Sequence, residues 1–343
     1  MRATLQGQEN GFERACTGYF SLDFLLSSQN NEVGIPLRTT MELYGPAGHG
    51  KSTISQFLAG KVAAHIGATQ ITIADLETAL EEQHLISTVS NAGFSGVVRI
   101  VESVDKKRKP RTHEEILQET VDSLLKPEVG VIIIDSLGMI MPRAEMENPL
   151  GSANMGRRAQ LVAQMNRRIL NHLRIVEPAK LAIQVNHQYA SMGGMGKGRV
   201  TPGGDSKGYA AAVRLSIWRM EIFKDGSSLV SLRTDKLRYG GVIPDRKGFL
   251  FVIPGYGVSM EMTYVFDAIA AGIAKRGRSG VTIGDEHFGH VPTLIRRAKE
   301  GQVEYFLPFF EALQREFTAP LMEEEPEDGE TTILSDEVEE GVR

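Results

Sequence analysis

Apolar and polar residues follow two different periods along the first two thirds of the chain. Short apolar runs of the kind that form strands recur at five places, 40–44, 70–75, 97–101, 130–135 and 180–186. Helical spacing of apolar residues fills the intervals, at 51–65, 79–91, 113–126 and 156–176, and a shorter amphipathic helix is expected near 20–26. Strands that alternate with helices predict an α/β fold, in which a mostly parallel sheet has helices on both faces.

A different pattern begins after about residue 210. Runs rich in β-forming residues lie at 213–222, 229–235 and 249–253 and are joined by turns, which predicts an antiparallel extension of the sheet. The following residues are more basic and are expected to form a small C-terminal α+β domain. The predicted organisation is therefore a short N-terminal segment, a core, this small domain and a disordered acidic tail, with bounds at 1–16, 17–255, 256–320 and 321–343.

The formal net charge of −5 hides an uneven distribution of acidic residues. Residues 321–343 contain ten acids and one arginine, so that residues 1–320 hold 37 basic and 33 acidic side chains, a net charge of +4. A mildly basic body is compatible with a polyanionic partner, with which the acidic tail would compete for the basic body. A tail that only improves solubility is equally compatible with this composition.

Composition also excludes some classes of protein. No apolar run approaches the ~18 residues that a membrane-spanning helix requires, and the first residues lack the apolar segment of an export signal. Cys16 is the only cysteine, which excludes an internal disulfide and suits a reducing compartment. We therefore expect a cytoplasmic protein without a membrane partner.

A glycine-rich motif lies between the strand at 40–44 and the helix at 51–65. It fits the pattern G-x-x-x-x-G-K-[ST] and consists of Gly45, Pro46, Ala47, Gly48, His49, Gly50, Lys51, Ser52 and Thr53. Its glycines allow backbone N–H groups to surround phosphate oxygens at a helix N-terminus. Lys51 can reach the outer phosphates, and the Ser52 hydroxyl can bind Mg²⁺. The motif predicts a protein that binds a nucleoside triphosphate.

Two acidic residues follow other predicted strands. Asp135 ends the apolar run 131–134, at the carboxyl edge where ligands of open α/β sheets bind, and is the expected acid of the magnesium shell. Glu77 lies just beyond the strand at 70–75, where its carboxylate could orient the attacking water. A second interpretation of Glu77 stays open, in which it caps a helix that begins near Ala79.

The motifs and their order resemble the RecA family of DNA recombinases. The resemblance covers about residues 17–300 and is best at 45–53 and 131–158. It is carried by Thr17-Gly18-x-x-Ser21-Leu22-Asp23, the phosphate-binding motif, Asp75-x-Glu77, Asp135-Ser136, and Pro142-Arg143-Ala144-Glu145-Met146-Glu147 through Met155-Gly156. The histidine in Val185-Asn186-His187 is similar to the recombinases of large phages, because the bacterial enzyme has glutamine there. The resemblance implies a RecA-like P-loop ATPase core with ATP and Mg²⁺ as cofactors.

The resemblance also implies roles for individual residues of the ATP site. Glu77 would be the catalytic carboxylate, and Lys51 would act on the outer phosphates. His187 falls where the family senses the γ-phosphate and relays its presence to a DNA-binding loop, and an imidazole can donate to phosphate. A histidine that is merely satisfied within the core is the alternative. Glu81 and His84 match positions that flank the adenine, where His84 replaces a tyrosine and stacks more weakly.

Two stretches match the DNA-binding loops of the family, at 147–156 and 188–204. The second is rich in glycine and has no apolar periodicity. Its amides and cations could contact phosphates, and its methionines could insert between bases. In the bacterial pattern the basic residues cluster nearer the start of this loop, so single contacts stay open. The expected DNA-binding residues are Met155, Gly156, Arg157, Met192, Met195, Lys197, Arg199, Gly203 and Gly204.

Other basic and aromatic residues have two interpretations each. Lys236 and Arg238 match a lysine pair that crosses the subunit interface of the family to the neighbour's γ-phosphate, or they form a strand-end pair in water. Tyr209 matches an aromatic residue of that interface, although without the resemblance it would be assigned to the core. The basic run 106–111 could hold a second DNA segment or be a solvated surface.

The resemblance implies a DNA-dependent ATPase that coats single-stranded DNA as a homo-oligomeric filament, with ATP between subunits. It would pair this strand with homologous duplex DNA and promote strand exchange in recombination and repair, in a bacterial or phage-infected cell. A single-strand-binding protein and a loader are the accessory partners that it implies. Two alternatives stay open, a hexameric replicative helicase with the same core and a regulatory protein that binds ATP without hydrolysing it. Because sixteen residues precede Thr17, where the family generally has a longer arm, assembly is expected to need nucleotide and DNA.

Overall fold

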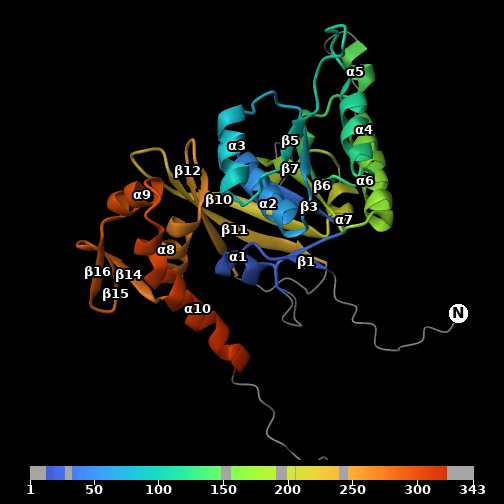
Figure 1. Cartoon of the computed structure of the whole chain (residues 1–343). Coiled ribbons are helices and arrows are strands. Elements are labelled where there is room, and N and C mark those ends of the chain that lie inside the picture. The colour runs from blue at the N-terminus through green and yellow to red at the C-terminus, as the bar shows by residue number, and fades with distance from the viewer. Residues whose placement is uncertain are drawn as a thin grey trace, which may run out of the picture.

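The centre of the molecule is a nine-stranded sheet (Figure 1). The computed structural model describes residues 13–27, 33–147, 156–190, 199–204, 206–238 and 246–322. Within these residues the strand order of the sheet is β13-β12-β11-β10-β3-β7-β6-β4-β5. Five neighbouring strands are parallel, and they are β3 (Thr39–Gly45), β7 (Leu181–His187), β6 (Val129–Asp135), β4 (Gln70–Asp75) and β5 (Val97–Ile100). The predicted parallel sheet is confirmed.

Helices cover both faces of the parallel strands. Two of them pack on one face and two on the other, and they are α2 (Lys51–His65) with α3 (Glu82–Asn91), and α4 (His113–Ser123) with α6 (Arg157–Ile175). The contacts of strand β6 explain why its sequence is apolar on both faces. Ile133 packs with the first pair of helices, whereas Ile132 and Ile134 pack with the second pair. Because both faces of the strand are buried, no position on it faces water.

The predicted antiparallel extension is also confirmed. It consists of β10 (Val213–Ile222), β11 (Ser228–Leu237), β12 (Gly248–Ile253) and β13 (Gly257–Ser259). Strand β10 runs parallel to β3, so the extension begins directly beside the strand that carries the phosphate-binding motif. Gly45 is needed at this contact, since a Cβ there would lie 2.3 Å from the Ile217 carbonyl oxygen.

The small C-terminal unit combines helices with a three-stranded sheet, and its hydrophobic core also includes Phe251 and Ile253 of the central sheet. Its elements are α8 (Met260–Ala270), β14 (Ala274–Gly277), β15 (Gly280–Ile283), β16 (Glu286–Gly289), α9 (Val291–Lys299), the 3₁₀ helix η2 (Val303–Phe306) and α10 (Leu307–Met322). Helix α1 (Phe20–Leu25) packs against this unit, and the rings of Phe20 and Phe317 stack at 5.7 Å. The N-terminal and C-terminal parts of the described chain therefore share a contact (Figure 1).

The remaining elements are short. They are β1 (Arg14–Ala15), β2 (Ile35–Pro36), the 3₁₀ helix η1 (Leu137–Met139), α5 (Arg143–Glu147), β8 (Tyr189–Ala190), β9 (Arg199–Val200) and α7 (Ser206–Ala210). Residues 323–343 of the predicted acidic tail and most of the segment 1–16 lie outside the described residues. Among the helices that the structure describes, none has the length and apolar character needed to span a membrane.

Two predicted helix boundaries are wrong for identifiable reasons. The helix expected over 79–91 begins at Glu82, because the Asp75 carboxylate accepts the N–H groups of Glu77 and Leu80 and holds 75–80 in a turn. The helix expected over 113–126 ends at Ser123, and the carbonyl groups that follow accept hydrogen bonds from the buried ammonium of Lys180. Both corrections come from side-chain contacts to the backbone.

Candidate nucleotide site and DNA loops

The phosphate-binding motif joins β3 to α2 at the carboxyl edge of the sheet. Gly48 and Gly50 have φ of 70° and 83°, a region that favours glycine, so that the loop turns sharply before the helix begins at Lys51. The ammonium of Lys51 donates to the Pro46 carbonyl at 2.7 Å. Burial lowers the pKa of Lys51 and outweighs the opposite effect of the nearby Asp135 and Glu77 carboxylates. The lysine is thus held inside the loop, beneath the space that a phosphate chain would fill.

Asp135 lies at the end of β6, in register with Asp75 at the end of β4. Its side chain is buried, and burial raises its pKa to about 6, with a smaller opposing effect from a Ser52 hydrogen bond. The Oδ1 atom has no hydrogen-bond partner among the described residues. A buried acceptor without a partner fits a cation ligand, and one carboxylate, one hydroxyl and phosphate oxygens suit Mg²⁺. The residues present therefore fit the expected ion.

Glu77 joins two other strand ends. Its Oε1 accepts a hydrogen bond from the Ser136 hydroxyl at 2.5 Å and lies 2.5 Å from Nε2 of His187, at the end of β7. Burial raises the pKa of Glu77, but the contacts with Ser136 and His187 and the charge of Lys51 outweigh it and lower the pKa. The carboxylate is therefore ionised at neutral pH and can accept a proton.

The alternative role of Glu77 as a helix cap is wrong. Helix α3 begins five residues later, and its N-cap position is Glu81. The turn after β4 is instead held by Asp75, and Thr78 adopts a φ of 53° within it. This turn directs Glu77 toward Ser136 and His187. The contact with Ser136 had no sequence signal, because a serine after an apolar strand is common.

A buried polar cluster connects the end of β7 to the second loop. The amide of Asn186 donates to Glu42 at 2.9 Å and to the Pro202 carbonyl at 3.0 Å. Glu42 is fully buried on β3, and its other oxygen accepts a hydrogen bond from Nε of Arg214 at 2.6 Å. Asn186 precedes His187, so the residue beside the Glu77 carboxylate and the anchor of the loop are neighbours on one strand. Sequence reasoning missed this cluster.

The two residues expected around the base, Glu81 and His84, have different surroundings in the structure. Nε2 of His84 lies 2.9 Å from the Thr53 hydroxyl, so its ring is held against the start of α2. Glu81 is exposed and makes no side-chain cap. The ring of His49 lies 5.0 Å from that of Trp218 on β10, a contact between the phosphate-binding loop and the extension that the sequence did not indicate.

The two loops are described only at their ends. Met155, Met192, Met195 and Lys197 lie outside the described residues, and for Arg199 the structure describes the backbone of β9 but no side-chain position. The anchoring ends are described, with Gly156 as the N-cap of α6 and Arg157 exposed beside it. At the far end of the second loop, Gly203 and Gly204 have φ of 99° and 72°, and the ammonium of the buried Lys207 donates to the Gly204 carbonyl at 2.6 Å.

Lys236 and Arg238 do not join the phosphate-binding loop of their own chain. The Lys236 ammonium donates to the Gly208 carbonyl at 2.6 Å, and the Arg238 guanidinium donates to the Tyr209 carbonyl. Burial lowers the pKa of Lys236, as do the neighbouring Arg238 and Arg214. The core alternative for Tyr209, which composition alone would favour, is wrong, because 76% of this residue is exposed. Three residues with an expected interface role thus lie together on a surface.

Comparison with known proteins agrees with this geometry. The RecA N-terminal domain model matches residues 3–239. Protein RecA of Tropheryma whipplei is 30% identical over 290 residues, which cover 82% of this chain and 61% of that protein. The RecA proteins of Saccharopolyspora erythraea and Mycolicibacterium smegmatis are each 29% identical over 277 residues, which cover 80% of this chain and 75% and 74% of those proteins. The family model covers well over half of the sequence, and the chain belongs to the RecA family.

Proposed function

We propose that this protein is a DNA-dependent ATPase that assembles on single-stranded DNA and promotes homologous pairing and strand exchange. The observation that carries the proposal is the contact between Glu77 and His187, because it joins a hydrolytic carboxylate to the strand from which the second loop departs. Family membership supports the same activity. The bacterial relatives support action in the cytoplasm of a bacterial or phage-infected cell.

In the proposed site each residue has a separate task. The amides of 45–53 would surround the phosphates, and the Lys51 ammonium would neutralise charge that develops on the γ-phosphate. Glu77 would hold the attacking water in line and accept its proton. Ser52 and Asp135 would hold Mg²⁺, which when bound neutralises the β- and γ-phosphate oxygens.

Coupling to DNA would depend on which acceptor His187 binds, the Glu77 carboxylate or a γ-phosphate. Its Nε2 faces Glu77 in the structure, and a γ-phosphate offers a competing acceptor. A shift of His187 would move its neighbour Asn186, whose amide bonds the Pro202 carbonyl of the second loop. ATP would therefore bias the loop toward a DNA-binding arrangement, and hydrolysis would release it.

ATP would also join subunits. Lys236 and Arg238 lie on an exposed surface with Tyr209, away from the nucleotide loop of their own chain. We propose that they reach the γ-phosphate of a neighbouring subunit, where the planar guanidinium of Arg238 can bind two oxygens. The filament would then form only with nucleotide.

The proposal is tested by two measurements on the full chain. ATP turnover should rise strongly when single-stranded DNA is added, and a protein that binds ATP without turnover in either condition would contradict the enzyme. Electron microscopy with single-stranded DNA and a slowly hydrolysed ATP analogue should show helical filaments. Closed six-membered rings would instead favour the helicase alternative.

A further inference from the structure

A compact basic hairpin, residues 103–111, connects β5 to α4. Its two arms are joined by hydrogen bonds from the Asp105 N–H to the Lys109 carbonyl and from the Arg111 N–H to the Ser103 carbonyl, at 2.8 and 2.9 Å. A β-bridge between Val104 and Pro110 lies between these bonds. The segment is therefore a built element whose tip is made of four consecutive cations, Lys106, Lys107, Arg108 and Lys109.

The single acid of the hairpin is turned toward the backbone. Oδ1 of Asp105 accepts the N–H groups of Lys107 and Lys109, each at 2.8 Å, and these bonds fix the tip. Arg108 has a φ of 58°, a conformation that glycine or asparagine adopts more easily. The chain thus carries a long cationic side chain at the position where a turn would more commonly have a small residue.

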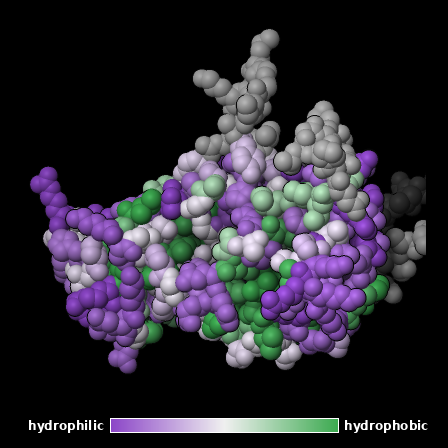
Figure 2. Space-filling view, turned by 90° about the horizontal axis from the view of Figure 1, so that it is seen from above, coloured by the Kyte–Doolittle hydropathy of each residue, from purple (hydrophilic) through white to green (hydrophobic). Residues whose placement is uncertain are grey.

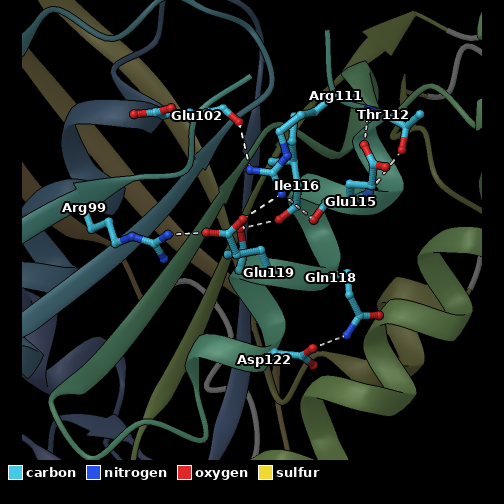
Figure 3. Close-up of polar contacts among 10 residues, drawn as sticks. Arg99, Glu102, Arg111, Thr112, Glu115, Ile116, Gln118, Glu119 and Asp122 are labelled. Atoms are coloured by element: carbon cyan, nitrogen blue, oxygen red, sulfur yellow. Dashed lines mark hydrogen bonds and ion pairs between the residues drawn. The ribbon is translucent and has the colours of Figure 1, made fainter. Parts of the chain in front are cut away.

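The base of the hairpin is fastened to α4 by a fifth cation. Arg111 forms an ion pair with Glu119 at 2.6 Å and donates to the carbonyl oxygens of Glu102 and Glu115, and Arg99 binds the other oxygen of Glu119 (Figure 3). Arg111 is therefore occupied within the fold. Its contacts fix the direction of the tip and leave the recognition of any ligand to the four cations beyond it.

The four tip cations are free to meet a ligand. All four side chains are exposed, and none forms an ion pair with another part of the chain that the structure describes. With Asp105 included, the tip carries a net charge of +3. Residues 103–111 contain no aromatic residue on which a base could stack. Cations without a stacking surface bind the nucleic-acid backbone rather than its bases.

The hairpin lies at the same edge of the sheet as the candidate DNA loops. Strand β5 is two strands away from β6, about 10 Å at the usual strand spacing, and the first loop follows β6. The start of α4 holds the segment that leads into this loop, since Nδ1 of His113 accepts the Met141 N–H at 3.0 Å and Glu114 accepts the Arg143 N–H at 2.6 Å. The hairpin and α5 rise together at the top of Figure 1. Figure 2 looks down on this edge and shows large hydrophilic areas with hydrophobic residues between them.

We propose that the basic hairpin binds DNA phosphates outside the path of the strand held by the two loops. The inference rests on the proposed function, because it takes the edge beside β6 and β7 as the side that meets DNA. The shared chemistry is a row of backbone phosphates, which either a further stretch of single strand or a duplex segment can supply. The hairpin adds affinity without reading sequence.

The test removes the four charges and keeps the fold of the hairpin. The variant carries Lys106→Gln, Lys107→Gln, Arg108→Asn and Lys109→Gln, in which asparagine suits the positive φ. A matched control removes four exposed cations elsewhere on α6 and beyond the end of α4, by Lys126→Gln, Arg167→Gln, Arg168→Gln and Arg174→Gln. A third protein keeps all charges and carries Lys106→Arg, Lys107→Arg, Arg108→Lys and Lys109→Arg. ATP turnover without DNA and the melting temperature report whether each protein is folded.

DNA affinity is measured by anisotropy across a salt titration, with a slowly hydrolysed ATP analogue, in separate arms for a single-stranded oligonucleotide and a duplex. Loss of a phosphate contact lowers the slope of log K against log salt by about 0.9 for duplex and about 0.7 for a single strand. If two to four duplex contacts are lost, the ratio of wild-type to variant affinity for duplex DNA should fall by about 12-fold to about 150-fold between 50 and 200 mM salt. The arm in which the slope falls identifies the source of the phosphates.

The control and the charge-keeping protein should retain the wild-type slope. Equal slopes for the wild type and the charge-removed variant in both arms would overturn the proposal, as would an equal loss in the matched control. If the wild type shows no nucleotide-dependent DNA binding, the proposed function itself fails. If the wild type binds DNA but the removal of the hairpin charges leaves the salt slope unchanged, only the proposal for the hairpin fails.

Discussion

Replacement of Glu77 by glutamine isolates the proton-accepting role of this residue from its packing. Glutamine has nearly the same shape, and its carbonyl oxygen can still accept the Ser136 hydrogen bond that Glu77 accepts at 2.5 Å. The substitution removes a carboxylate whose pKa is lowered, although burial alone would raise it, by the contacts with Ser136 and His187 and by Lys51. The fold and the phosphate cradle should therefore persist while the proton acceptor is lost.

The size of the effect follows from this division of roles. General acid–base catalysis by a positioned side chain contributes about 10²- to 10⁴-fold, which corresponds to about 2.7 to 5.4 kcal/mol of activation free energy. We expect Glu77→Gln to reduce DNA-stimulated turnover by a factor in this range, with little change in ATP affinity. The lowered pKa keeps Glu77 ionised until the pH falls below its ordinary range, so a loss of wild-type activity near pH 6 should come from protonation of Asp135, whose pKa burial raises to about 6.

The assay is phosphate release with and without single-stranded DNA, together with binding of a fluorescent ATP analogue. Glu82→Gln is a suitable control, since this exposed carboxylate lies on the first turn of α3 outside the site. Turnover by Glu77→Gln at the wild-type rate would refute the reasoning and leave Glu77 as a polar link between three strands.

Three further predictions address the cradle, the interface and the core. Lys51→Ala should reduce phosphate release by about 10²-fold or more, and turnover near the wild-type rate would exclude charge neutralisation by this lysine. Arg238→Gln should preserve ATP binding but weaken the light scattering that reports filaments on DNA, and unchanged scattering would mean that it does not reach a neighbour. Burial raises the pKa of Asp267 to about 7. The folded state therefore favours the protonated carboxyl of Asp267. This contribution to stability is complete below the unfolded pKa of about 3.8 and is lost as the pH rises through about 7. Asp267→Asn should therefore raise the melting temperature at pH 8 by more than at pH 5, and an equal effect at both pH values would contradict this.

The sequence predicted the strands more closely than the connections between them. The runs 70–75 and 213–222 match β4 and β10, and for β4 the apolar composition follows from burial of its four central residues in the sheet. The start of α3 was misplaced because Asp75 binds backbone N–H groups in a turn, a contact that propensity does not report. Polar contacts between residues distant in the sequence could not be predicted either, because propensity does not report them.

In the site, too, residues that belong to a sequence pattern could be predicted, whereas contacts between distant residues could not. Lys51 could be named because it lies in a fixed motif, and Asp135 and Glu77 because they lie at or just beyond strand ends, which the parallel sheet brings to one edge. Glu42 and Trp218 could not be named, because their partners are distant in sequence. Ser136 was noted beside Asp135, but its contact with Glu77 could not be predicted for the same reason. Tyr209 shows the limit of composition alone, since an aromatic residue would be assigned to the core without the resemblance, and this one is exposed.

The buried Glu42 links the end of β7 at His187 to the second loop at Pro202, because both contacts pass through Asn186. A carboxylate with no exposed surface is costly unless it is paired, and here one oxygen is bound by Asn186 and the other by Arg214. Asn186 can bond the Pro202 carbonyl and Glu42 at the same time only while β7 keeps its present position. A movement at His187 would therefore leave a buried charge with one bond fewer, so that small displacements are resisted until a ligand compensates for the lost contact. Such an arrangement favours two discrete positions of the loop over a continuous range, and a switch driven by nucleotide requires this property.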